Sequence, residues 1–283
     1  MSAFVRHPAS VEEAVGLLAE IEGSRPISGG ASLVAMMNAR LVEPSCVVSL
    51  ERVEGLCGVV RQLDGGVRIG AMTRHREIVV SPVLDGAHAL LRQAAGVIAN
   101  RPVRNMGTLG GALANADPAA DYLPALRCLD AEVEIAGPSG RRAAPISEFV
   151  VGWYETVLGP SEIVVAVRLP SLPPGPTLFR KVARVSGDYA TASCALRVEE
   201  DARGVMLRAS IGACGPGPLR DEAAEERLRG RLHDRGAILA LGEALQALAD
   251  PIDDVRGSAD YRRALIPRLI AAGAAELTGA GHD

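Results

Sequence analysis

The sequence predicts an α+β protein in two parts, and three observations support this. Along the first 170 residues, helix-period apolar patterns alternate with short β-branched or alternating segments typical of strands. A proline-rich segment, 170–176, then marks a linker. Beyond it, three strand-like segments are followed only by helical ones. The 283 residues suffice for two domains or for one large domain with an appendage.

Composition excludes several classes of protein. A net charge of −4 argues against a nucleic-acid partner or a membrane surface. The five cysteines are scattered without a CxxC pair, which argues against a zinc ribbon, a locally ligated iron–sulfur cluster and a secreted disulfide framework. The N-terminal residues lack the apolar core of a signal peptide, and no apolar run is long enough to span a bilayer. We therefore expect a cytoplasmic protein.

The N-terminal region predicts a helix and then a glycine turn. Ser10 and Glu13 form a capping box, and an apolar helical stripe follows them. Residues 25–34 then read as a short extended segment, a Gly29-Gly30 turn and a new helix capped by Ser32. This layout points backbone N–H groups at a phosphate, although the segment matches neither a Walker A loop nor a GxGxxG fingerprint. A simple packing turn is the alternative.

The middle of the first part predicts a hairpin, two helices and further strands. The hairpin turn is Asp64-Gly65-Gly66. In chain order, the expected segments are strands 46–50, 59–63 and 67–71, helices 73–79 and 83–98, and strands 131–136 and 163–169.

A stretch of small residues, 101–121, lies between these helices and strands. Gly110-Gly111 would let the backbone approach a ligand and adopt positive φ, and Thr108 offers a hydroxyl. The exposed N–H groups of such a turn suit an anion. Asp117-Pro118 predicts the start of the next helix, and Asp121 in its first turn suits a sugar hydroxyl or a ring N–H. A tight turn between core elements is the alternative for one glycine pair alone.

The second part predicts an antiparallel sheet followed by helices. The expected strands are 178–185, 190–198 and 205–211, and the expected helices are 221–248 and 260–277. Glu225 and Arg229 are spaced for an i,i+4 ion pair in the first helix. Pro267 should kink or divide the second helix.

Two glycine loops suited to anions imply a ligand with more than one phosphate. The chain offers no Ser/His/Asp arrangement and no His/carboxylate set for a metal. Its histidines are isolated in the sequence, so we expect each to be a surface or hydrogen-bonded histidine and not a metal ligand. They are His7, His75, His88, His233 and His282. A protein of this kind leaves its chemistry to a redox cofactor.

The motifs Ser28–Leu33, Thr108–Asp121, Phe179–Ala190 and Arg256–Arg263 together resemble one family. It is the FAD-binding medium subunit of the molybdenum hydroxylases, of the carbon monoxide dehydrogenase and xanthine dehydrogenase type. The resemblance covers essentially the whole chain. It implies a two-subdomain FAD-binding fold of the PCMH / vanillyl-alcohol-oxidase-like kind over 1–172, with subdomains of about 1–54 and 55–172. A small C-terminal domain of antiparallel sheet plus helices would follow over 177–283.

The resemblance also assigns FAD contacts, and it assigns no catalytic residue or metal ligand to this chain. Ala112 departs from the asparagine that the family often has, which removes a hydrogen bond worth about 1 kcal/mol. Tyr189 matches a tyrosine beside the isoalloxazine, with a half-buried sheet residue as the alternative, and Lys181 is the only lysine. The assigned residues are Ile27, Ser28, Gly29, Gly30, Ala31, Ser32, Leu33 and Val34 in a first pyrophosphate loop, Thr108, Leu109, Gly110, Gly111 and Ala112 in a second, and Ile98, Asp121, Val164, Lys181 and Tyr189 elsewhere.

The function that the resemblance implies is electron relay. A large partner subunit with a molybdenum cofactor would hydroxylate the substrate. A small subunit with two [2Fe-2S] clusters would carry electrons to the FAD of this chain, in a dimer of heterotrimers. An external acceptor such as NAD⁺, oxygen, a quinone or a cytochrome would receive them. The alternatives are a stand-alone FAD-dependent oxidoreductase and a structural subunit without flavin.

Overall fold

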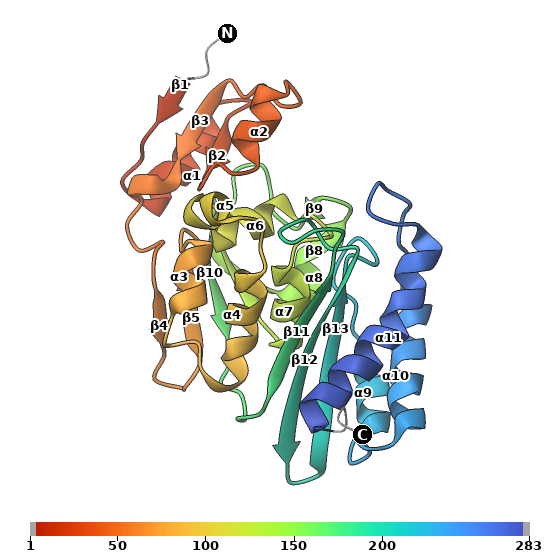
Figure 1. Ribbon diagram of the computed structural model, residues 1–283. Helices are drawn as coiled ribbons and strands as arrows, with labels where there is room; N and C mark the ends of the chain where they lie inside the picture. The colour runs from red at the N-terminus through yellow and green to blue at the C-terminus, as the bar shows by residue number, and fades with distance from the viewer. Residues whose placement is uncertain (1–3, 280–283) are drawn as a thin grey trace.

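The computed structural model describes residues 4–279 and begins with a small lobe at the top of Figure 1. Its parallel sheet has the strand order β1-β3-β2. The predicted capping box is confirmed at its first helix, where Ser10 Oγ accepts from the Glu13 N–H at 3.1 Å. The elements of the lobe are β1 (Phe4–Arg6), α1 (Val11–Glu20), β2 (Arg25–Ile27), α2 (Leu33–Asn38) and β3 (Cys46–Ser49).

An antiparallel sheet with the order β4-β5-β10-β6-β7 forms the centre of the molecule. Its middle strand, β10 (Ile163–Leu169), has the predicted bounds and is buried over Ile163–Val167, as its β-branched sequence requires. The predicted hairpin is confirmed as β4 (Val59–Arg61) and β5 (Val67–Gly70). The remaining strands are β6 (Glu132–Gly137), β7 (Gly140–Pro145), β8 (Val150–Gly152) and β9 (Glu155–Thr156), the last two forming a separate pair.

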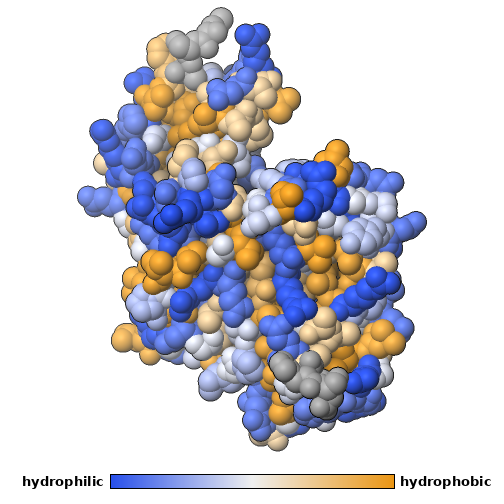
Figure 2. All heavy atoms as spheres, viewed as in Figure 1, coloured by the Kyte–Doolittle hydropathy of each residue, from blue (hydrophilic) through white to orange (hydrophobic). Residues whose placement is uncertain are grey.

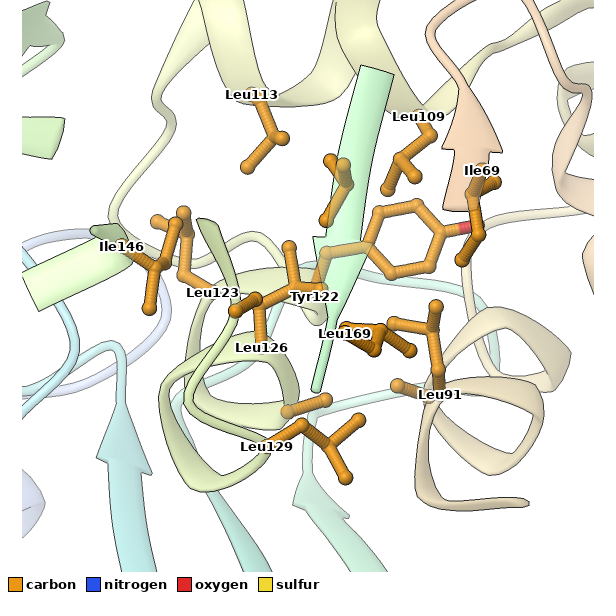
Figure 3. Close-up of a cluster of buried hydrophobic side chains, with 14 of the residues drawn as sticks. Ile69, Leu91, Leu109, Leu113, Tyr122, Leu123, Leu126, Leu129, Ile146 and Leu169 are labelled. Carbon is orange, nitrogen blue, oxygen red and sulfur yellow. The ribbon is translucent and has the colours of Figure 1, made fainter. Parts of the chain in front are cut away.

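Short helices cover this sheet and bury a large apolar core. Figure 3 shows the ring of Tyr122, fully buried, surrounded by Ile69, Leu91, Leu109 and Leu169. The helices are α3 (His75–Val80), α4 (Ala89–Gly96), α5 (Arg101–Met106), α6 (Leu109–Asn115), α7 (Tyr122–Cys128) and α8 (Ile146–Phe149).

The C-terminal part is an antiparallel sheet between two layers of helices, with β12 as its middle strand. Alternate residues of β12 face different cores: Ala195 packs with the α4 and α7 side, whereas Cys194 and Leu196 pack with the C-terminal helices. The predicted α+β fold class is therefore confirmed. The elements are β11 (Thr177–Val182), β12 (Ala192–Asp201), β13 (Gly204–Gly212), α9 (Glu222–Leu228), α10 (Arg235–Ala247) and α11 (Ala259–Thr278). His282 and the outermost ends of the predicted domains lie outside the described residues.

One prediction about the C-terminal helices is wrong, and Pro267 does not divide the second of them. The expected helix 221–248 is divided into α9 and α10, because Gly230 adopts φ +71° between them. Conversely, α11 runs unbroken through Pro267. The proline removes the N–H that would bond to the carbonyl of Arg263, and Gln246 Nε2 donates to that oxygen instead, at 3.0 Å. Gly242 makes room for the ring, since a Cβ there would lie 2.7 Å from Pro267 Cα.

One predicted helix start is also wrong, and one predicted cap bond is not made. The helix after the small-residue stretch begins at Tyr122 rather than at Pro118, because Asp117 Oδ1 accepts from the Ala119 N–H in a local turn. Ser32 precedes α2 but makes no side-chain cap bond.

A buried ion network joins the C-terminal part to α7. The predicted pair of Glu225 with Arg229 is wrong, because Glu225 is fully buried and accepts from Arg220 Nε at 2.8 Å, Arg208 Nη1 at 3.0 Å and the Ala209 N–H at 2.9 Å. Arg220 also donates to Asp130, just beyond α7. The network therefore fixes the C-terminal sheet against the central core.

Glu225→Ala is predicted to destabilise the protein by about 3–5 kcal/mol, because it leaves the buried Arg220 without its main partner. The neighbouring variant Glu226→Ala is the matched control, since Glu226 is exposed and its partner Arg229 keeps a second carboxylate partner in Asp201. Urea unfolding should show a large fall in the midpoint for Glu225→Ala alone. Equal losses in both variants would contradict the network's importance.

Candidate functional site

A cavity of about 560 Å³ opens where the three parts of the fold meet. It is bordered by the Ile27–Leu33 segment of the N-terminal lobe, by the start of α6, and by Lys181 on β11 of the C-terminal sheet. The outline of the molecule is notched between the N-terminal lobe and the rest (Figure 2). A volume of this size is typical of sites for organic ligands and cofactors.

The first glycine turn follows β2 and forms one wall. A Cβ on Gly29 would lie 1.8 Å from the carbonyl oxygen of Met106, so glycine alone fits there, and Gly30 adopts φ +75°. Within residues 4–279, the backbone N–H groups of Gly29–Ser32 donate to no protein acceptor. Several N–H groups free along one turn form a concave site for an anion.

The second glycine pair has a different role from the one predicted. Gly110 and Gly111 lie in the first turn of α6, and neither has positive φ. Their N–H groups already donate, to the Ala71 carbonyl at 2.8 Å and to Thr108 Oγ1 at 3.1 Å. A Cβ on Gly110 would meet that of Ala71 at 2.5 Å. The pair therefore permits close packing of α6 against Ala71. Gly111 leaves room beside Thr108 and Ser28 because it has no side chain.

A buried ion pair forms the far wall. Lys181 Nζ lies 2.8 Å from Asp121 Oδ2, with side-chain exposures of 8% and 5%, and also donates to the Val97 carbonyl. Asp121 Oδ1 is buried without a hydrogen-bond partner among the described residues. Burial raises the pKa of Asp121 to about 6, against the lowering effect of Lys181. Asp121 Oδ1 is therefore suited to accept a hydrogen bond from a ligand O–H or N–H, as the sequence predicts.

The cavity brings together all the predicted contact residues except two. Leu109 is fully buried in the central core, and Val34 lies on α2 with its methyl group against Gly30. The other predicted residues line the cavity: Ile27, Ser28, Gly29, Gly30, Ala31, Ser32, Leu33, Ile98, Thr108, Gly110, Gly111, Ala112, Asp121, Val164, Lys181 and Tyr189.

Several lining residues were not predicted. The segment Thr156–Ile163 contributes one side of the cavity. The only local feature in its sequence is Gly159-Pro160, which indicates a turn and no ligand. Leu50, Asn115 and His75 also line it. His75 Nδ1 lies 3.0 Å from the hydroxyl of Tyr122, and burial lowers the pKa of this histidine to about 4, so it is neutral near pH 7. It is a hydrogen-bonded histidine, as expected.

The part of the chain from residue 4 to 279 holds neither a group of His, Cys, Asp and Glu residues that could bind a metal ion nor a helix long and apolar enough to cross a membrane.

Protein-family models match two consecutive segments of the chain. Residues 2–172 match the FAD binding domain in molybdopterin dehydrogenase. Residues 177–277 match the CO dehydrogenase flavoprotein C-terminal domain. Together these two matches extend over nearly the whole sequence.

Similar proteins agree with these matches. The carbon monoxide dehydrogenase medium chain of Hydrogenophaga pseudoflava is 35% identical over 93% of this chain and 92% of its own length. The 6-hydroxypseudooxynicotine dehydrogenase complex subunit alpha of Paenarthrobacter nicotinovorans is 37% identical over 92% and 89%. A solved structure of carbon monoxide dehydrogenase from Hydrogenophaga pseudoflava superposes with a TM-score of 0.93 at 33% identity, covering 99% of this chain and 98% of the other. The chain therefore belongs to the family of FAD-binding medium subunits of the molybdenum hydroxylases.

Proposed function

We propose that this chain binds one FAD non-covalently in the cavity and relays electrons from the [2Fe-2S] clusters of a partner chain to an external acceptor. One observation supports this most strongly. Gly29–Ser32, whose backbone N–H groups are free, and Asp121, whose buried Oδ1 has no hydrogen-bond partner among the described residues, line the same cavity. A dinucleotide offers both an anionic pyrophosphate and hydroxyl or ring N–H donors, so the two walls suit its two kinds of group.

Each wall has its own task in this proposal. The Gly29–Ser32 turn holds the pyrophosphate through main-chain N–H groups, and the Thr108 hydroxyl adds a side-chain contact beside it. Asp121 accepts from a hydroxyl or ring N–H, and Lys181 keeps that carboxylate charged. The bound flavin supplies the redox chemistry itself. Neither glycine loop contains a histidine or cysteine that would attach it covalently.

The proposed FAD contacts are the residues assigned from the sequence that line the cavity, and Val34 and Leu109, which do not line it, would support its walls from behind. We also propose the domain division 1–172, with subdomains of about 1–54 and 55–172, and 177–283. It is supported by three apolar clusters centred on the N-terminal lobe, the central sheet and the C-terminal sheet, although Ile163 and Val165 of β10 join the first and Ala195 of β12 joins the second.

The partners follow from the family. Its members carry names such as medium chain and complex subunit, which describe multi-chain enzymes. We propose an iron–sulfur small subunit and a molybdopterin large subunit, assembled as a dimer of heterotrimers that donates to NAD⁺, oxygen, a quinone or a cytochrome. A cytoplasmic location stays a prediction.

The direct test is the absorption spectrum of the purified chain, followed by isolation of the complex from its source. Oxidised flavin bands, three chain types in native mass spectrometry, and molybdenum and iron in the complex are expected. A chain that never binds flavin would overturn the proposal. So would a lone monomer with full activity, which would favour a stand-alone flavin oxidoreductase.

Gly111→Val is predicted to weaken FAD binding by at least about tenfold. A side chain at this position starts 2.9 Å from Thr108 Oγ1 and 3.5 Å from Ser28 Cβ, so it disturbs the wall between the two loops. Gly16→Val on α1 is the control, because no atom lies within 4 Å of a Cβ there. Flavin titration of the apoprotein measures both. Unchanged affinity in Gly111→Val would show that the wall is assigned wrongly.

FAD affinity is predicted to fall as the pH drops from 7 to 5. The pKa of Asp121 is raised to about 6, so protons compete with the ligand donor below that pH, with a slope of at most about tenfold per pH unit. The same raised pKa has the opposite effect on the stability of the apoprotein. The contribution of the Asp121 carboxyl to that stability rises as the pH falls, whereas FAD affinity falls. Asp121→Asn should bind FAD more weakly at pH 7 and lose the pH dependence. An unchanged slope in that variant would exclude Asp121 as its source.

A further inference from the structure

We propose that Arg256 is a positioning residue that fixes the ring of Tyr189 at the edge of the cavity. The inference rests on the proposed function, in which Tyr189 lies beside the flavin. Tyr189 is 42% exposed on the connection between β11 and β12, and it lines the cavity. An exposed aromatic ring has several rotamers open to it unless another group holds it in place.

The side chain of Arg256 contacts Tyr189 in two ways. Its guanidinium carbon lies 5.0 Å from the centroid of the tyrosine ring, within the range of a cation–π interaction. Its Nε lies 3.4 Å from Asp188 Oδ1, and the same oxygen accepts from the Tyr189 N–H at 2.8 Å. One arginine is thus linked to both the ring and the backbone of Tyr189.

The backbone around Arg256 is anchored independently of this side chain. Thr191 Oγ1 donates to the Arg256 carbonyl at 3.0 Å, and Arg262, a buried residue on α11, donates to the Thr191 carbonyl at 2.8 Å. A Cβ on Gly257 would lie 2.9 Å from a methyl group of Thr191, so the two segments are in close contact. Figure 1 shows that α10 and α11 run antiparallel, with the connection that carries Arg256 between their upper ends.

This arrangement gives the Arg256–Arg263 motif a function at the site, although it lies far along the chain from the glycine loops. The main-chain bonds to Thr191 would survive any side chain at position 256. Only the guanidinium reaches the Tyr189 ring and Asp188. The guanidinium also lies 3.7 Å from Asp254 in its own turn, but Asp254 keeps the Arg256 N–H and Arg262 as partners in any variant. Substituting Arg256 therefore changes the positioning of the ring while the other bonds of the segment remain.

The test is a double-mutant cycle in the purified holo-complex, with Arg256→Met, Tyr189→Ala and the combined variant. Reduced flavin is reoxidised by NAD⁺, oxygen and a quinone analogue in a stopped-flow instrument, and flavin content and the flavin absorption bands are recorded. With Tyr189 present, Arg256→Met is expected to change the reoxidation rate about two- to fivefold, in the same direction as Tyr189→Ala. With Tyr189→Ala as the background, Arg256→Met should have no further effect. Flavin content should stay at the wild-type level throughout.

Two further variants separate positioning from charge. Arg256→Lys keeps the cation but loses the planar guanidinium and its Nε, so it should restore only a small part of the wild-type rate, and full restoration would overturn the positioning role in favour of charge alone. Arg263→Met removes another arginine of the same motif, whose ion pairs are with Asp250 and Asp260 and not with Asp188, and should leave the rates nearly unchanged.

Each contrary result has its own meaning. Wild-type rates in Arg256→Met, or equal changes with and without Tyr189, would overturn the positioning role while leaving the FAD site intact. Wild-type rates in Tyr189→Ala for all three acceptors would overturn both the placement of Tyr189 at the flavin and this inference. A complex without flavin would overturn the proposed function itself.

Discussion

The buried ion pair between Lys181 and Asp121 is the contact on which the cavity depends. It joins a strand of the C-terminal sheet to the N-terminal end of α7 in the central core. Two charges removed from water are tolerated only when they are paired closely. Because Lys181 pairs with one carboxylate oxygen, the other is left without a partner among the described residues, in a residue that lines the cavity. The C-terminal part therefore completes the site and is not an appendage to it.

The nearly exclusive use of arginine fits this division of work. At the junction of the two parts, Arg220 bonds simultaneously to Glu225, to Asp130 and to the Arg127 carbonyl. A planar guanidinium with five donors can hold several acceptors in fixed directions, whereas an ammonium acts as a compact charge. Arginines thus hold the domains together, and the only lysine in the chain supplies the ammonium that pairs with Asp121 in the cavity wall.

Local sequence patterns correctly predicted elements that are determined by residues close together in the chain, such as the β4–β5 hairpin and the bounds of β10. Family resemblance added sixteen of the residues that line the cavity, including Asp121 and Lys181. Some failures had local causes, since Gly230 divides the expected helix 221–248 and the Asp117 turn delays the start of α7. Others depended on distant residues: α11 continues through Pro267, and Gln246, on another helix, donates to the carbonyl that the proline frees. Segment 156–163 reaches the cavity only through the tertiary fold, so no motif within it could reveal its role.

The two glycine pairs look alike in sequence but have different structural roles, one in anion binding and one in packing. Gly29-Gly30 leaves main-chain donors unpaired, so it offers the anion site its hydrogen bonds. Gly110-Gly111 uses its own donors within the protein and instead lets α6 pack against Ala71. Ala112, where the family often has asparagine, follows the second pair, and its N–H is likewise used by the Thr108 carbonyl. A missing side-chain amide at that position therefore leaves the main anion-binding groups untouched, because they belong to the first turn.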